Sequence, residues 1–226
     1  GSICSLLALF KRIGKPQTAT VAAMNQSGSL LSLTFDAPKW QGHQAGQFLF
    51  LRAHGESHPF TIASNWNPEN QQINLIIKDL GDYTHRLSQR LNIGDTVQID
   101  GAYGRFNFSD KNEQIWVSNG IGFTPFLARL KELAKQPSNQ PIDWFHTDRN
   151  LSAEIIDQWK DLAQQANVTF HYIPSETQRL SADYIAQSIQ NSETCSLWLC
   201  GSRSFTSSIA GNLKTRSLHQ ELFEFR

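Results

Sequence analysis

Cysteine is scarce in this sequence of 226 residues, which contains only Cys4, Cys195 and Cys200. Three cysteines at this spacing are too few for a disulfide framework or a zinc site. Free thiols are typical of a reducing compartment. The sequence therefore implies no metal centre and no fold that depends on covalent cross-links.

An excess of charge of one sign is also absent, because twenty basic residues balance twenty acidic ones. Proteins that bind nucleic acid usually present a strongly basic surface, so we expect no nucleic-acid partner. Repeats and low-complexity runs are lacking as well. With 39% hydrophobic and 18% charged residues, the composition is that of a globular protein with one large domain or two small ones.

A long hydrophobic run is the third missing feature. Residues 3–10 (ICSLLALF), followed by Lys11 and Arg12, are apolar but shorter than the ~20 residues of a membrane-spanning helix. Two interpretations stay open: a first strand or packing helix, or the end of a removed transmembrane helix with its basic residues on the cytoplasmic side. Gly1 and Ser2 are interpreted as a tag remnant.

The first half of the chain, from about residue 17 to residue 106, consists of short segments that alternate between apolar and polar residues. The segment LLSLTF at 30–35 places Leu31, Leu33 and Phe35 on one face. Similar strand-like segments follow at 46–52, 73–78 and 96–100. Together they predict an antiparallel β-barrel, interrupted by one helix over about 83–91.

The second half alternates strand-like and helix-like segments after a polar connection at 107–114. The strand-like segments read IWVS, IDWFHT, VTFHYI and LWLCG, and helices are predicted from Thr124 and over 153–166. This order predicts a parallel sheet with crossover helices, whose ligand crevice lies at the carboxyl ends of the strands. The predicted organisation is a tag and possible membrane-helix remnant at 1–15, a barrel domain at 16–108 and an α/β nucleotide-binding domain at 109–226.

Two turns carry signals of phosphate binding. In WVSNGIGFTPF (116–126), Gly120 and Gly122 let backbone amides approach a ligand, and Thr124 and Pro125 stand where an N-cap and a first-turn proline are expected. In KDLGDYTHRL (78–87), a glycine permits a turn before a capped helix. A tight structural turn and a well-capped helix remain open as alternatives, because neither turn is a complete dinucleotide fingerprint.

Six motifs follow one another in a fixed order. They read HPFTIAS, GDYT, GAYG, NGIGFTPF, LCGS and the terminal ELFEFR. This series resembles the flavin and nicotinamide domains of the ferredoxin-NADP reductase superfamily, most closely its ferric reductase and NADPH oxidase branch, from about residue 16 to residue 226. In that branch a haem-carrying membrane domain precedes these two domains, which favours the transmembrane interpretation of residues 3–10.

The resemblance assigns flavin contacts to the segment 58–61, where plant-type relatives carry Arg-x-Tyr-Ser. It implies that Phe60 packs against the isoalloxazine ring and that the Thr61 hydroxyl hydrogen-bonds near flavin N5. Pro59 stiffens the pair, and His58 hydrogen-bonds a ribityl or phosphate oxygen without arginine's permanent charge. The remaining FAD positions implied for the barrel are Ile77 and Lys78 beside the flavin, and Gly81, Asp82, Tyr83 and Thr84 around the pyrophosphate.

The resemblance also assigns nicotinamide contacts to the second domain. The nucleotide loop is implied to comprise Gly120, Ile121, Gly122, Thr124 and Pro125. Cys200 and Gly201 lie near the nicotinamide ring, although a lone buried cysteine is more often a small hydrophobe. Arg149 meets the ribose or its 2′-phosphate, which favours NADPH over NADH. The preference is only mild, because the neighbouring Asp148 would disfavour a phosphate. Phe225 shields the flavin face that the nicotinamide must occupy, and Glu221 matches an acidic position of uncertain role.

Four residues depart from the family pattern. Ala102 and Ser202 replace prolines, and Ser118 and Asn119 replace Ala-Gly. Asn119 is expected to adopt left-handed backbone, which asparagine tolerates better than most residues. A looser nicotinamide loop predicts a high Michaelis constant for the coenzyme.

The function implied is electron transfer from NAD(P)H through FAD, with hydride delivered to flavin N5 and electrons leaving singly. In the intact protein they pass to the haem of a missing membrane domain and then to ferric iron or oxygen, on the cytoplasmic side of the inner membrane. The alternatives are a soluble flavin or ferric reductase with diffusible acceptors, and a non-enzymatic flavin-binding sensor or interaction module. The terminal acceptor and the oligomeric state stay open.

Overall fold

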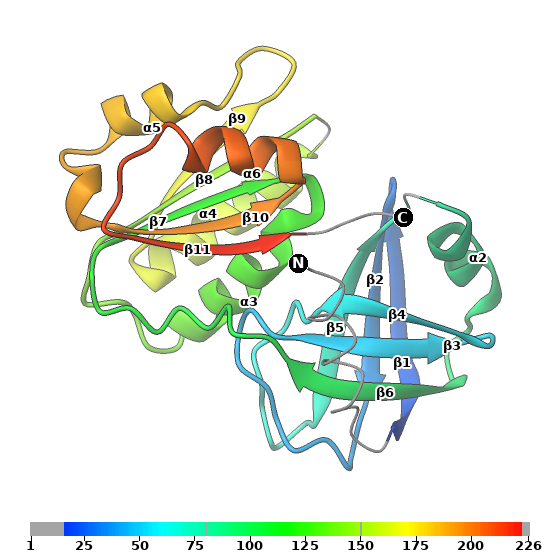
Figure 1. The fold of residues 1–226 in the computed structure, drawn as a ribbon. Helices are drawn as coiled ribbons and strands as arrows, with labels where there is room; N and C mark the ends of the chain where they lie inside the picture. The colour runs from blue at the N-terminus through cyan, green and yellow to red at the C-terminus, as the bar shows by residue number, and fades with distance from the viewer. Residues whose placement is uncertain (1–15, 80, 150, 223–226) are drawn as a thin grey trace, which may run out of the picture. The chain divides into compact units, whose positions relative to one another are not determined.

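The computed structural model of the protein describes residues 16–79, 81–149 and 151–222 (Figure 1). Residues 1–15, interpreted above as a tag and membrane-helix remnant, lie outside the described residues. The described residues form two compact units that divide between Arg105 and Phe106. Each unit has its own sheet and its own hydrophobic core.

The first unit contains an antiparallel sheet of six strands in the order β4-β3-β6-β1-β2-β5. Its elements are β1 (Gln17–Ser27), β2 (Leu30–Asp36), β3 (Phe48–Ala53), β4 (Glu56–Thr61), β5 (Gln72–Lys78), α2 (Asp82–Arg90) and β6 (Thr96–Tyr103). A bridge between Ile62, directly after β4, and Leu75, in the middle of β5, joins the two edge strands. The sheet therefore curls into the predicted barrel, and the predicted helix over 83–91 is α2.

Alternation along the strands builds the core of the barrel. Leu31, Leu33 and Phe35 of β2 are at most 5% exposed, whereas Ser32 and Thr34 between them are half-buried. On the pleated sheet successive side chains point to opposite faces, so the apolar set gathers inside. The pattern read from the sequence thus fixes which face of each strand becomes the core.

The second unit is a parallel sheet of five strands in the order β11-β10-β7-β8-β9. Its strands are β7 (Gln114–Asn119), β8 (Ile142–Asp148), β9 (Thr169–Pro174), β10 (Ser196–Gly201) and β11 (Ser217–Leu222). Its helices are η1 (Gly120–Phe123), α3 (Thr124–Leu133), α4 (Ala153–Ala166), α5 (Ala182–Ser188), η2 (Ser192–Thr194) and α6 (Arg203–Ala210). From β7 the chain builds outward through β8 and β9 and then returns to β10, so the strand order reverses between β7 and β10. This reversal is the topological switch point of the sheet.

Helices cover both faces of this sheet, as a buried parallel sheet requires. On one face Trp116 and Trp144 stack with Phe126 of α3, and Trp159 of α4 stacks on Trp144 with ring centroids 5.3 Å apart. The apolar residues of α5 and α6 pack on the other face. Each buried aromatic side chain contributes roughly 1.5–3 kcal/mol, so these contacts are a main source of the unit's stability.

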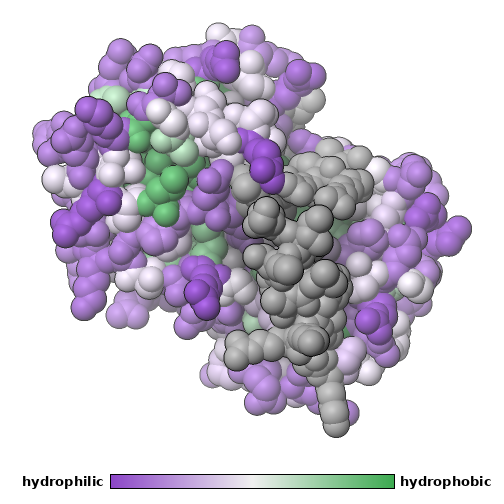
Figure 2. Space-filling model, in the orientation of Figure 1, coloured by the Kyte–Doolittle hydropathy of each residue, from purple (hydrophilic) through white to green (hydrophobic). Residues whose placement is uncertain are grey.

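The described surface is mostly hydrophilic on the face drawn in Figure 2, where one compact hydrophobic patch lies over the second unit. Ile93 and Leu218 are the large hydrophobic side chains that are most exposed, at 66% and 48%. None of the helices in the described ranges has the length and hydrophobicity to cross a membrane.

Candidate functional site

Two predicted ligand-binding segments of the first unit lie on its edge strands. Within the described residues β4 pairs only with β3, β5 pairs only with β2, and the two edges touch at the Ile62–Leu75 bridge. Because the bridge is antiparallel, residues 58–61 before it and residues 77–78 after it lie on the same side. The fold therefore brings these two segments together at strand edges that carry no further strand.

Thr61 ends β4 with a buried hydroxyl. The residue is 4% exposed, and its Oγ1 has no hydrogen-bond partner among the described residues. Such a buried, unpartnered polar atom is uncommon in folded proteins, and a bound ligand is one explanation for it. The preceding Phe60 is half-buried and packs against the barrel core. An aromatic ring and a hydroxyl without a partner among the described residues thus lie on adjacent residues of β4.

Tyr83 from α2 extends this aromatic surface. Its ring stacks on His58 with centroids 3.8 Å apart and lies nearly parallel to Phe60 at 6.4 Å. The Tyr83 hydroxyl is also buried without a partner among the described residues, and burial, with a smaller contribution from Glu56, raises its pKa to about 12. Tyr83 is therefore neutral at physiological pH and offers an aromatic face and a hydrogen-bonding group.

Glu56 is a functional candidate that the sequence reasoning missed. One carboxylate oxygen lies 3.1 Å from His58 Nε2, and the other accepts a 2.7 Å hydrogen bond from Arg86 Nη2. These two hydrogen bonds lower the pKa of Glu56. The period-two spacing of Glu56 and His58 was a usable signal, because it places both on one face of a strand.

The turn before α2 is closed by Thr84. Its Oγ1 accepts a 3.1 Å hydrogen bond from the Gly81 amide and lies 2.9 Å from the Gly81 carbonyl oxygen, to which it donates. Gly81 is the N-cap with extended backbone, so its left-handed freedom is not used. Asp82 begins the helix, where a carboxylate is favourable. Ile77 is buried in the core, so only its backbone faces the strand edge, and Lys78 beside it is half-buried.

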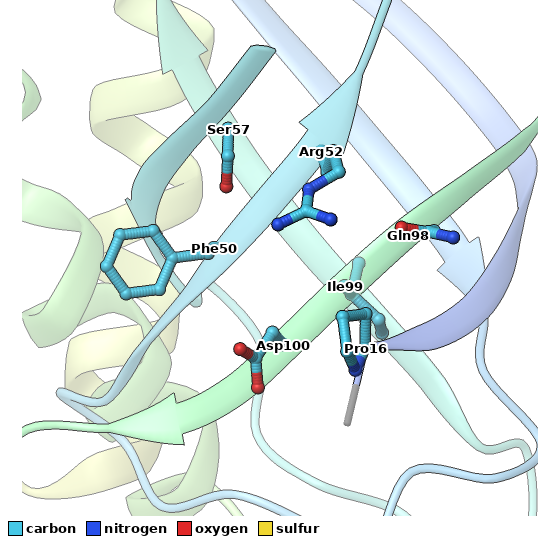
Figure 3. Close-up of a pocket in the computed structure, with 7 residues that line it drawn as sticks. All are labelled: Pro16, Phe50, Arg52, Ser57, Gln98, Ile99 and Asp100. Atoms are coloured by element: carbon cyan, nitrogen blue, oxygen red, sulfur yellow. The ribbon is translucent and has the colours of Figure 1, made fainter. Parts of the chain in front are cut away.

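A separate pocket of about 130 Å³ opens on the outer face of the same barrel (Figure 3). Pro16, Phe50, Arg52, Ser57, Gln98, Ile99 and Asp100 line it. Phe50 and Arg52 alternate with the buried Leu49 and Leu51, so they point away from the core. The pocket therefore contains none of the predicted site residues.

The glycine turn of the second unit is built by close backbone contact. A Cβ atom on Gly122 would overlap the carbonyl group of Cys200, which shows how closely η1 approaches the end of β10. Gly120 has a φ of 52°, whereas Asn119 has an extended φ of −131°. The expectation that Asn119 is left-handed was wrong, because the glycine beside it takes that conformation.

The residues after this turn differ in part from expectation. Thr124 is not the N-cap: it is the first residue of α3, and its hydroxyl donates a 3.2 Å hydrogen bond to the Ile121 carbonyl, because η1 already supplies the preceding turn. Pro125 occupies the first turn, as predicted. Arg149 is exposed just beyond the carboxyl end of β8. Phe225 lies outside the described residues.

The buried Cys200 and the half-buried Glu221 lie on neighbouring strands. They are register partners in β10 and β11, and Cys200 is fully buried. Burial, reinforced by Glu221, raises the pKa of the Cys200 thiol well above its usual value, so the thiol stays protonated. Burial also raises the pKa of Glu221 to about 7, and its Oε2 has no partner among the described residues.

The polar atoms left without partners test whether a flavin and a nucleotide fit. In the first unit the Thr61 and Tyr83 hydroxyls meet this description. In the second unit Thr147 Oγ1, which the sequence reasoning also missed, and Glu221 Oε2 meet it near the carboxyl ends of β8 and β11. These four atoms lie where a hydrogen-bonding ligand is expected, whereas Gln17 Oε1, Arg129 Nε and Trp198 Nε1, which also lack a partner among the described residues, lie elsewhere in the two units. The placement of the first four is compatible with the two cofactors.

Comparison with known proteins gives the same assignment. Residues 15–119 match a family described as an FAD-binding domain. Ferric reduction oxidase 4 of Arabidopsis thaliana is 34% identical over 49% of this chain and 17% of its own length, and respiratory burst oxidase homolog protein E of the same plant is 27% identical over 51% and 15%. Terephthalate 1,2-dioxygenase reductase component 2 of a Comamonas species is 31% identical over 66% of this chain and 45% of its own length. The chain therefore spans less than half the length of these relatives.

The fold has solved counterparts as well. The FAD/NAD-binding domain of nitric oxide dioxygenase from Vibrio cholerae superposes with a TM-score of 0.76 at 20% identity, over 94% of this chain and 99% of that one. The class of protein is therefore a two-domain flavin and nicotinamide oxidoreductase module. Within that class, the fold is that of the ferredoxin-NADP reductases, and the FAD-binding domain is similar to those of the ferric reductase and NADPH oxidase type. The resemblance and the fold class predicted from the sequence are confirmed.

Proposed function

We propose that this chain accepts hydride from NADPH onto FAD N5 and releases the electrons singly. In the intact protein the electrons would pass to a membrane-bound haem and on to ferric iron or oxygen. The observation that carries this proposal is the buried, unpartnered Thr61 hydroxyl at the end of β4. FAD, when bound, supplies the hydride acceptor and the one-electron donor, while the protein supplies binding and alignment.

The first unit would hold the flavin with residues from three elements. Phe60 would pack against the isoalloxazine ring, and Thr61 would hydrogen-bond near the reactive nitrogen. Pro59 has no backbone N–H to donate to a further strand at this edge of β4, and its ring stiffens the segment. The turn at 81–84 would hold the pyrophosphate, with Tyr83 stacked on His58 beside it. The Ile77 and Lys78 backbone would run along the flavin.

The second unit would hold the coenzyme at the carboxyl ends of its central strands. The loop comprising Gly120, Ile121, Gly122, Thr124 and Pro125 would receive the nucleotide, and Cys200 with Gly201 would lie near the nicotinamide ring. The exposed Arg149 would meet the ribose or its 2′-phosphate. Phe225 would have to leave the flavin face before hydride transfer. NADPH is proposed because of Arg149, and NADH stays an alternative because Asp148 beside it would disfavour a 2′-phosphate.

Anaerobic reduction of added FAD tests this function. The chain is mixed with FAD and then with NADPH or NADH, and bleaching of the flavin absorbance is followed. Prompt bleaching, faster with NADPH, is expected. A protein that binds FAD but shows no bleaching with either coenzyme would contradict the proposal and favour the sensor or interaction module.

A soluble reductase with diffusible acceptors is the second candidate. It is favoured by the similarity to the dioxygenase reductase component, which extends over 66% of this chain. Adding ferric citrate or a protein electron acceptor to the FAD-loaded chain separates the two candidates. Multiple turnovers at rates near that of flavin reduction would support the soluble reductase, whereas slow reoxidation would favour a dedicated haem partner.

A further inference from the structure

We propose that Asn119 is a positioning residue for the nicotinamide nucleotide. Its carboxamide ties the turn after β7 to the turn after β10, across the switch point of the parallel sheet. The inference rests on the proposed function, because it concerns the coenzyme that the second unit would bind. Asn119 was noted in the sequence only as a departure from the family pattern.

The position of Asn119 in the fold allows its side chain to link the two turns. It is the last residue of β7, and β10 is the strand beside β7, with Ser118 opposite Cys200 in the register. Strand order reverses between these two strands. Ligands of open α/β sheets bind outside the carboxyl ends of the strands at such a reversal. A side chain that links the two turns there therefore sets the geometry of the predicted coenzyme site.

The contacts of the carboxamide are made to one residue. Asn119 Oδ1 accepts a 3.0 Å hydrogen bond from the Ser202 amide, and Asn119 Nδ2 lies 3.5 Å from Ser202 Oγ. A Cβ atom on Gly201 would overlap Asn119 Oδ1, so only glycine leaves room for the carboxamide. The three residues thus form one local unit, which we name the Asn119 latch: Asn119, Gly201 and Ser202.

The backbone of Ser202 explains why the latch is needed. Its φ of −64° is the value that a proline ring enforces, yet serine does not enforce it. The Ser202 side chain makes no capping hydrogen bond to α6. Its backbone amide, which a proline would lack, is the donor to Asn119. The hydrogen bond therefore restrains a turn that a proline would restrain covalently.

This arrangement reverses the expectation of a loose nicotinamide loop. A turn fixed before the ligand arrives lowers the entropic cost of binding. Asn119 and Ser202 are both departures from the family pattern, and in the structure each is the partner of the other. Their effects on coenzyme binding should therefore be coupled rather than additive.

A double-mutant cycle tests the latch with the full chain. Asn119→Ala, Ser202→Pro and the double variant are compared with the wild type by calorimetric titration with NADP⁺. Each single variant is expected to raise Kd by roughly 2- to 10-fold, which is the value of one net hydrogen bond. In the double variant proline replaces the lost restraint, so its Kd should return to within about twofold of the wild type. FAD affinity and the thermal midpoint of the first unit should not change.

The matched control is Asn112→Ala. Asn112 Nδ2 donates a 3.3 Å hydrogen bond to Ser196 Oγ at the amino end of β10, away from the carboxyl ends. Its NADP⁺ Kd should equal that of the wild type. If the wild type binds NADP⁺ and Asn119→Ala binds it with the same affinity, or if the losses of the two single variants add in the double variant, the latch is overturned but the proposed function is not. A wild type that binds neither NADP⁺ nor NAD⁺ overturns both.

Discussion

The Thr61 hydroxyl lies at the end of an edge strand with no partner among the described residues. Burying a hydroxyl without a hydrogen bond costs free energy, on the order of 1–3 kcal/mol in proteins. A residue that is kept at such a cost has a reason outside the stability of the ligand-free fold. The proposed hydrogen bond near flavin N5 supplies that reason.

Thr61→Val separates function from stability at this position. Valine keeps the shape and removes the unpartnered hydroxyl, so the free energy of unfolding of the FAD-free protein should stay the same or rise by about 1 kcal/mol. Flavin reduction by NADPH should slow by roughly fivefold to tenfold, the value of one hydrogen bond, with FAD still bound. Urea unfolding and anaerobic stopped-flow absorbance measure the two effects. Thr61→Ser, which keeps the hydroxyl, is the control, and a wild-type rate in Thr61→Val would refute the assigned role.

Glu221 is the second residue whose burial has a measurable consequence. Its pKa is raised from 4.5 to about 7 by burial, so the folded state holds a proton that the unfolded chain releases. The resulting stabilisation is complete below pH 4.5 and is lost as the pH rises through about 7. Between these values the free energy of unfolding should fall by ~1.4 kcal/mol per pH unit, or ~3 kcal/mol altogether.

Glu221→Gln should remove this dependence on pH. Glutamine is neutral at every pH, so the unfolding free energy of the variant should be flatter than that of the wild type from pH 4.5 to 7. Urea unfolding at a series of pH values, followed on the second unit, provides the measurement. Parallel curves for the two proteins would mean that Glu221 ionises normally in the folded state.

At the scale of elements, η1 and β10 approach each other closely at Gly122 and Cys200. Gly122 has no room for a Cβ atom because the Cys200 carbonyl group occupies that space. Backbone atoms move less readily than the end of a flexible side chain. The glycine is therefore required by packing of two elements, independently of any ligand.

Gly122→Ala should accordingly destabilise the second unit even without a nucleotide. Overpacking against the backbone should lower the free energy of unfolding by ~1–3 kcal/mol or more. Gly81→Ala is the matched control, because a Cβ there meets nothing within 4 Å and the backbone is extended. At this N-cap the cost should be at most ~1 kcal/mol. Thermal unfolding of the FAD-free protein compares the two, and equal losses would contradict the packing argument.

The docking of helix α2 on β4 positions two side chains of the candidate flavin site. The helix supplies Tyr83 to the ring of His58 and Arg86 to the carboxylate of Glu56. Both contacts depend on how the helix docks on β4. Because Arg86 and Glu56 are each about 40% exposed, solvent screens their ion pair and it contributes little to stability. We expect it mainly to orient the side chains beside the proposed pyrophosphate turn.

On the scale of the whole molecule, the two units carry separate cores and separate ligand residues. Each proposed cofactor should therefore stabilise the unit that supplies most of its contacts. A ligand that binds only the folded state at about 100 times its Kd adds ~2.7 kcal/mol to the stability of that state.

Differential scanning calorimetry tests this division. FAD should raise the midpoint of one unfolding transition, and NADP⁺ should raise the midpoint of the other. Thr61→Val should keep the FAD shift, since the ring and the pyrophosphate turn are unchanged, whereas Asn119→Ala should reduce only the NADP⁺ shift. A single transition that responds equally to both ligands would show that the units unfold together.

The fold class and the positions of the candidate ligand-binding segments were predicted from the sequence alone. The period-two pattern predicted the barrel, and the alternation of strands and helices predicted the parallel sheet with four of its strands, because apolar periodicity is a local property of the chain. It did not predict β11. Sequence motifs alone indicated the segment 58–61, the turn at 81–84 and the glycine turn at 120–122. Their assigned roles remain predictions that the variants above can test.

Only the tertiary structure decided how these segments meet within each unit. It placed Glu56 on His58 and Arg86, gave the left-handed conformation to Gly120 instead of Asn119, and joined Asn119 to Ser202. These contacts connect residues far apart in the sequence, and they depend on strand register and on the docking of helices. A single sequence carries no local signal for either, because both result from the packing of the complete core.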